Sequence, residues 1–157
     1  ALCQRSILYK TSDNTCNDWL NKRMHRNEFM PFAPVMTNEN ASKYLINYEK
    51  NDHSFKFMTC TSNVTSEFAE LCPAVTHIDK TARPQVVYKK VDAWLWKLLI
   101  KWEKISGEPS LINTSFNQHE EPIVCSYKDA IINLDNGTVD TLILDSFLIK
   151  KTNKEII

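Results

Sequence analysis

Two short segments, residues 76–85 and 113–117, gather polar side chains directly after predicted apolar strands. In open α/β sheets, ligands bind just beyond the carboxyl ends of the strands. Hydroxyl and amide groups there can hydrogen-bond to phosphate and ribose oxygens, and an arginine can clamp a phosphate with its bidentate fork. The pattern is compatible with a phosphate site, whose candidate residues are His77, Asp79, Thr81, Arg83, Asn113, Thr114, Ser115 and Asn117.

Each of these features also has a purely structural interpretation. An Asn-Thr-Ser sequence after a strand is common in Asx and Ser/Thr turns. His77 and Asp79 can form a surface turn, and Arg83 can pair with a nearby carboxylate. His25 and Arg26 can be ordinary surface charge. Spacing alone therefore leaves both interpretations open.

Composition excludes several classes of function. The chain has 157 residues, 19 basic and 19 acidic side chains and no net charge, so the basic footprint of a nucleic-acid-binding domain is missing. Only two glycines occur, Gly107 and Gly137, which rules out a glycine-rich phosphate loop of Walker or Rossmann type. No apolar run is long enough to span a membrane. Any phosphate site must therefore use arginines, hydroxyls and helix N-termini.

The five cysteines, Cys3, Cys16, Cys60, Cys72 and Cys125, are scattered and contain no Cys-x-x-Cys pair. This spacing predicts free thiols in a reducing compartment, the cytoplasm, and neither a disulfide framework nor a zinc site. The chain begins with Ala-Leu and not with Met, which suggests a piece of a longer protein.

Periodicity predicts a single α/β domain with a mixed sheet. Helices are expected over residues 13–23, 37–48, 92–106 and 126–137, with Thr37, Asp92 and Ser126 as caps and the two glycines after the last two helices. Strands are expected at residues 55–60, 73–76, 84–89, 111–112 and 141–145, a turn at 51–54 and an extended segment at 30–34. The tail from Lys150 is expected to be frayed.

The helix at 92–106 carries a broad apolar stripe that we expect to face the core. Its members are Trp94, Leu95, Leu98, Leu99, Trp102 and Ile105. Trp96 and Ile100 lie off this stripe, so they are predicted either to be exposed, as part of an interface, or to be covered by another element of the same domain.

The same segments resemble the C-terminal domain of the O-carbamoyltransferases of nodulation-factor and antibiotic biosynthesis. The matching stretches occur in the family's order and extend to about residue 149. They are Arg5-Ser6-Ile7-Leu8, Glu28-Phe29-Met30-Pro31-Phe32-Ala33-Pro34, Pro73-Ala74-Val75-Thr76-His77, Thr81-Ala82-Arg83-Pro84-Gln85, Asn113-Thr114-Ser115-Phe116-Asn117 and Glu121-Pro122-Ile123-Val124-Cys125.

The resemblance implies a YrdC-like fold, a twisted mixed sheet with flanking helices. It implies that residues 1–157 form carbamoyl adenylate from carbamoyl phosphate and ATP, with release of pyrophosphate. Mg²⁺ is expected to accompany the nucleotide, and no metal is expected to bind the protein itself. An N-terminal actin-like ATPase-fold domain, missing here, would hold the acceptor whose hydroxyl receives the carbamoyl group.

The resemblance also suggests roles for individual residues. Arg83 would clamp a phosphate, while Ser115, Asn113 and Thr114 would hold the phosphate or carbamoyl group through neutral hydrogen bonds. Arg5 and Arg26 would complete a basic pocket. The remaining candidates are the nucleotide-contacting or loop-shaping residues His77, Asp79, Thr81 and Asn117. Catalysis is expected to rest on positioning and charge stabilisation, without a protein nucleophile.

The chain departs from the family pattern at a few positions. Cys3, Lys80 and Glu120 stand where glycine is common, which implies stiffer or reshaped loops at Lys80 and Glu120. Met30 stands where many members have arginine. Two alternatives remain beside the carbamoyltransferase interpretation: a relative that makes another carboxylate or carbamate adenylate, and a non-catalytic binding or docking domain that retains the fold.

Overall fold

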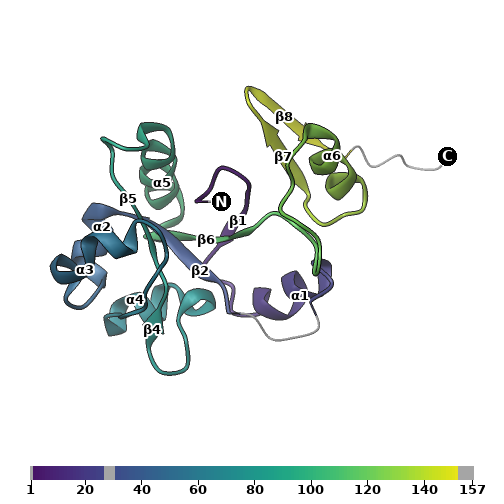
Figure 1. The fold of residues 1–157 in the computed structure, drawn as a ribbon. Helices are drawn as coiled ribbons and strands as arrows, with labels where there is room; N and C mark the ends of the chain where they lie inside the picture. Colours follow the sequence, from purple (N-terminus) through teal and green to yellow (C-terminus); the bar gives the residue numbers. More distant parts are fainter. Residues whose placement is uncertain (1, 27–30, 152–157) are drawn as a thin grey trace.

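The centre of the protein is a four-stranded mixed sheet in the order β1-β6-β2-β5, seen in a computed structural model that describes residues 2–26 and 31–151 (Figure 1). Strand β6 (Ser110–Ser115) pairs antiparallel with β1 (Ser6–Lys10) and with β2 (Ala33–Thr37), and β2 pairs in parallel with β5 (Gln85–Val87). Strands β1, β2 and β5 therefore begin towards the end of the sheet at which β6 ends, with Ser6 opposite Ser115 and Ala33 opposite Asn113, while Gln85 pairs with Val35. The predicted mixed α/β architecture is confirmed.

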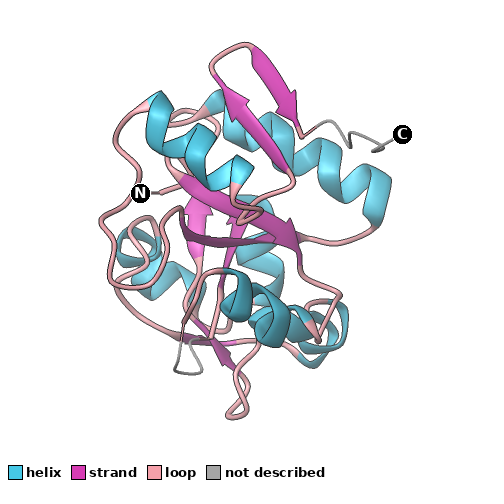
Figure 2. Cartoon of the chain, turned by 90° about the vertical axis from the view of Figure 1, so that its right-hand side faces the viewer, coloured by secondary structure: helices cyan, strands magenta, loops and turns pink. Residues whose placement is uncertain are grey.

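Helices cover both faces of this sheet (Figure 2). On one face, Leu95 and Leu99 of α5 (Ala93–Ser106) pack on Val35, Val87 and Leu111. The other face contributes to a larger core. The elements that supply this core are α1 (Cys16–Arg23), α2 (Asn38–Tyr44), α3 (Tyr48–Phe55), α4 (Ser66–Leu71), the 3₁₀ turn η1 (Pro73–Val75) and α6 (Tyr127–Asp135).

A small antiparallel strand pair and a hairpin complete the fold. Strands β3 (Ser62–Asn63) and β4 (Thr81–Ala82) pair beside the helices, and β7 (Thr141–Leu144) pairs with β8 (Phe147–Lys150) next to α6. The hairpin stands apart from the central sheet (Figure 1). Within residues 2–26 and 31–151, no helix is long and apolar enough to cross a membrane.

Side-chain caps fix the helix starts that the sequence predicts. Thr37 accepts a hydrogen bond from the Asn40 amide, and Asp92 accepts one from the Leu95 amide. Ser126 forms a capping box with Asp129. The predicted stops are also confirmed, because Gly107 and Gly137 both have a φ of 79°, the left-handed conformation that glycine adopts without strain.

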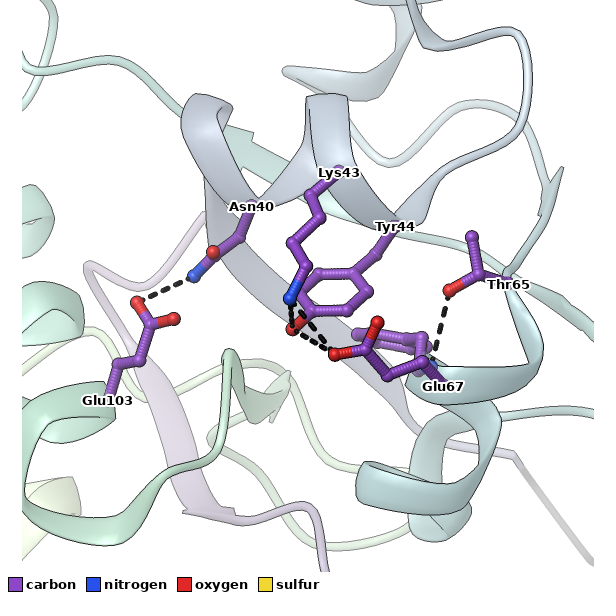
Figure 3. A network of polar contacts seen from close by, with 7 residues as sticks. Asn40, Lys43, Tyr44, Thr65, Glu67 and Glu103 are labelled. Atoms are coloured by element: carbon purple, nitrogen blue, oxygen red, sulfur yellow. Dashed lines mark hydrogen bonds and ion pairs between the residues drawn. The ribbon is translucent and has the colours of Figure 1, made fainter.

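Polar contacts also tie α2 to its neighbours (Figure 3). The buried Asn40 side chain donates to Glu103 of α5 at 2.9 Å, and Lys43 forms an ion pair with Glu67 of α4 at 2.9 Å. These contacts hold α2 between the helices on either side of the sheet.

Several predicted elements are wrong. Residues 55–60 are not a strand: Phe55 ends α3, which also contains the predicted turn at 51–54, and Met58 has a φ of 56°. The predicted helix 37–48 breaks because Leu45 turns extended to bridge Val64, and Asn47 adopts the left-handed conformation. The segment predicted as a strand at 73–76 contains the 3₁₀ turn Pro73–Val75 instead, with Pro73 in its first turn, where proline is favoured.

The first helix begins at Cys16, three residues later than predicted, because Asp13 forms a turn with Thr15 instead of a cap. The strand predicted at 141–145 is present, but Leu142 is its only buried residue. Part of the extended segment at 30–34 and most of the tail from Lys150 lie outside the described residues.

The stripe on α5 is only partly buried. Trp94 is 61% exposed and Ile105 is 83% exposed. Trp96 and Ile100 are partly buried, and Trp96 donates to Glu39. The unusual exposure predicted for them is therefore wrong, and the alternative of cover within the domain is confirmed in part, since Trp96 packs against the core beneath α5.

Candidate active site

Arg26 lies against the end of β6, in contact with two of the predicted site residues. Its Nη2 atom is 3.3 Å from the Thr114 hydroxyl and 3.4 Å from the Ser115 hydroxyl, and its guanidinium lies 5.9 Å from the centre of the Phe32 ring. The backbone at the end of α1 fixes its position, since the Arg26 amide donates to the Asn21 carbonyl.

The Arg26 guanidinium is half-buried, and this burial lowers its pKa from the ordinary arginine value. Arginine nevertheless stays protonated in proteins. Among the described residues, no carboxylate pairs with it. By contrast, Arg23, the last residue of α1, pairs with Asp140 at 2.9 Å. A desolvated cation held by neutral hydroxyls is incompletely compensated, so it favours an anionic ligand.

Asn113 lies two residues before Ser115 on β6, so the two side chains start from the same face of the strand. Its Nδ2 donates to Gln85 Oε1 at 2.5 Å and lies 3.7 Å from Met58 Sδ. Gln85 Oε1 also accepts from Cys3 Sγ at 3.5 Å. Burial raises the pKa of the Cys3 thiol to about 12, which keeps it protonated and able to donate.

Arg83 occupies the same end of the sheet. It precedes Pro84 and β5, whose first residue, Gln85, pairs with Val35 in the middle of β2. Its side chain is exposed, and it forms no ion pair or hydrogen bond with any residue in the described part of the chain. The structure thus offers no carboxylate partner in support of the ion-pair alternative. Convergence of Arg83 and Ser115 on one ligand stays a prediction.

His77, Asp79 and Thr81 form a self-contained turn. The Asp79 carboxylate accepts from the Thr81 amide at 3.0 Å and from its hydroxyl at 2.7 Å, and these bonds lower the pKa of Asp79. His77 Nδ1 lies 2.9 Å from the Thr81 hydroxyl. These contacts agree with the surface-turn interpretation, and a role in nucleotide binding stays a prediction.

Arg5 and Asn117 shape the loop after β6. Arg5 Nη1 donates to the Val124 carbonyl at 3.1 Å, and Asn117 Nδ2 donates to the carbonyls of Gln118 and Glu121. Arg5 also lines a largely apolar hollow of about 710 Å³ between β1 and β7. Arg26, Arg83 and Ser115 do not line that hollow.

The three positions where the family commonly has glycine all have left-handed backbone. The φ angle is 66° at Cys3, 60° at Lys80 and 62° at Glu120. Residues other than glycine are strained in this backbone conformation. The loops therefore keep a glycine-like conformation without glycine.

Sequence reasoning missed Gln85 and Met58 as neighbours of the site. Gln85 lies inside one of the motifs quoted above, two residues after Arg83, and that adjacency was the available signal. No sequence signal indicated Met58, because its position near Asn113 depends on the turn that follows α3.

Comparison with known proteins shows the family of the chain. Residues 1–151 match the family described as "Carbamoyltransferase C-terminus". The chain belongs to this carbamoyltransferase family. It is 37% identical to nodulation protein NolNO of Sinorhizobium fredii and 34% identical to nodulation protein NolO of Bradyrhizobium diazoefficiens, in each case over 96% of this chain. It is also 36% identical, over 96% of its length, to an uncharacterized protein of Methanocaldococcus jannaschii.

This carbamoyltransferase C-terminal chain spans only part of those relatives. It covers 22% of NolNO and 28% of NolO and of the archaeal protein. The activity and partners of a whole protein of this family are therefore matters for proposal.

Proposed function

We propose that this chain is the carbamoyl-adenylate-forming domain of an O-carbamoyltransferase, which uses carbamoyl phosphate and ATP. The observation that carries the proposal is Arg26, a half-buried cation without a carboxylate partner among the described residues, in contact with the hydroxyls of Thr114 and Ser115. Membership of the carbamoyltransferase family supports the identity of the transferred group.

The proposed reaction has two steps, and the first consumes one water molecule. Water releases the phosphate of carbamoyl phosphate, and an oxygen of the resulting carbamate attacks the α-phosphorus of ATP with pyrophosphate as the leaving group. Arg26 and Arg83 would neutralise the negative charge that accumulates when the two anions meet. Ser115 and Thr114 would orient phosphate oxygens, and Arg5 would hold the loop beside them.

The donor set fits the phosphates of a nucleotide. Arginine forks and hydroxyls donate to phosphate oxygens, and the turn formed by His77, Asp79 and Thr81 is our candidate for further nucleotide contacts. We expect Mg²⁺ to be held mainly by the phosphates of ATP. When bound, it would neutralise charge on those phosphates.

Transfer to an acceptor hydroxyl would require the rest of a longer protein. We expect an N-terminal actin-like domain to hold the acceptor, so the isolated chain should not carbamoylate any acceptor. We also propose a cytoplasmic location, because all five cysteines are free thiols, as in a reducing compartment.

Thermal unfolding with ligands tests the proposal. Carbamoyl phosphate and ATP should each raise the melting temperature, since a ligand at 100 times its Kd stabilises the native state by about 2.7 kcal/mol. Mixing both should release pyrophosphate. A shift with ATP alone would favour the adenylate of another carboxylate. No shift with either ligand would favour a non-catalytic docking domain.

A further inference from the structure

The side-chain amide of Asn113 is held in one orientation by its neighbours. Asn113 is only 4% exposed. Its Nδ2 lies 2.5 Å from Gln85 Oε1 and 3.7 Å from Met58 Sδ. A thioether sulfur can only accept a hydrogen bond, so the NH₂ end of the amide, and not its oxygen, faces Met58.

Gln85 reinforces this orientation. Gln85 is 5% exposed, and its Oε1 accepts from both Asn113 Nδ2 and Cys3 Sγ. Turning the Asn113 amide over would bring its oxygen against Gln85 Oε1 and Met58 Sδ, which are both acceptors. The Asn113 Oδ1 atom therefore points away from these partners, and no donor among the described residues is bonded to it.

An acceptor in this position has a clear chemical preference. Phosphate oxygens are acceptors as well, so Asn113 Oδ1 repels them. It can accept a hydrogen bond from an NH₂ group. Carbamoyl phosphate has such a group, whereas acetyl phosphate has a methyl group in the same position. Ser115 and Arg26, farther along the strand end, suit the phosphate instead.

We propose that Gln85 is a positioning residue that fixes the amide of Asn113 so that Oδ1 accepts a hydrogen bond from the NH₂ of the carbamoyl group. The inference rests on the proposed function and deepens it. Gln85 thereby makes the site selective for carbamoyl phosphate over acetyl phosphate, and Asn113 contacts the carbamoyl end of the ligand and not its phosphate.

The test is calorimetric titration of the chain with carbamoyl phosphate, acetyl phosphate and inorganic phosphate. One hydrogen bond corresponds to roughly a 3- to 10-fold preference for carbamoyl phosphate over acetyl phosphate. Gln85→Leu should lose this preference and keep its affinity for inorganic phosphate. Gln85→Glu should keep the preference, because a carboxylate oxygen still accepts from Asn113 Nδ2, although its charge weakens both ligands.

The outcomes separate the two proposals. Equal affinity of the unmodified chain for both acyl phosphates, or a preference that survives Gln85→Leu, would overturn the role of Gln85 and leave the proposed function standing. Failure of the unmodified chain to bind any of the three ligands would overturn both proposals. Should Gln85→Leu not fold, the ratio in the unmodified chain and its retention in Gln85→Glu are the decisive measurements.

Discussion

Replacing Lys80 with glycine should stabilise the protein. Lys80 has a φ of 60° and an exposed side chain. Its backbone amide donates to the His77 carbonyl at 2.9 Å, and its carbonyl accepts from the Val64 amide at 3.1 Å. Glycine preserves both bonds, so the substitution changes only the strain and the entropy of the backbone.

The two terms have opposite signs. A left-handed backbone destabilises a residue other than glycine by about 1–2 kcal/mol. Glycine itself destabilises the fold by about 0.4–1 kcal/mol, because it increases the conformational entropy of the unfolded chain. The net stabilisation by Lys80→Gly is about 0.8 kcal/mol. For a chain of this length, that corresponds to a rise in melting temperature of roughly 2–3 °C.

Urea unfolding measures this difference, and Lys90→Gly is the matched control. Lys90 is also an exposed lysine in a turn, but its φ is not positive, so glycine there should destabilise by about 0.4–1 kcal/mol. The opposite sign of the two effects is the critical result. A loss of stability in Lys80→Gly equal to that in the control would refute the strain argument.

Arg83→Ala should weaken carbamoyl phosphate binding by about 10- to 100-fold, and Ser115→Ala by less, with little change in melting temperature; early melting with normal binding would assign Arg83 a structural role. Glu108→Ala should destabilise by about 2–4 kcal/mol in urea, because its buried carboxylate accepts from the amide and hydroxyl of Thr11; a smaller loss would show that water replaces it. Backbone hydrogen bonds lower the pKa of Asp129. The ionised Asp129 therefore stabilises the fold above the ordinary aspartate pKa, and this stabilisation should be lost as the pH falls below about 4. Acid unfolding measures the loss, and Asp129→Asn should reduce the dependence of the unfolding free energy on pH in this range.

The sequence predicted those elements whose signals are local. Helix α5 has a cap at Asp92, an apolar stripe around Leu95 and Leu99 and a stop at Gly107, and all of these act within a few residues of one another. The strand predicted at residues 55–60 is wrong because Phe55 and Phe57 have the alternating spacing of a strand, whereas Phe55 ends a helix and Phe57 lies in the turn after it.

The site depends on contacts between distant parts of the chain. Arg26 and Ser115 are 89 residues apart in the sequence, and Gln85 and Asn113 are 28 residues apart. Periodicity carries no information about such pairs, because sheet register brings them together. Family resemblance named most of these residues, but the orientation of the Asn113 amide depends on Met58, which no motif indicated.

The central claim is that Arg26 binds an anion. Its most direct test is titration of carbamoyl phosphate into two variants, Arg26→Ala and Arg23→Ala. Arg26→Ala should weaken binding by about 10- to 100-fold, as expected for loss of a charge-assisted hydrogen bond. Arg23→Ala, which removes an arginine already paired with Asp140, should bind like the unmodified chain. Equal affinities in both variants and the unmodified chain would contradict the proposed anion site.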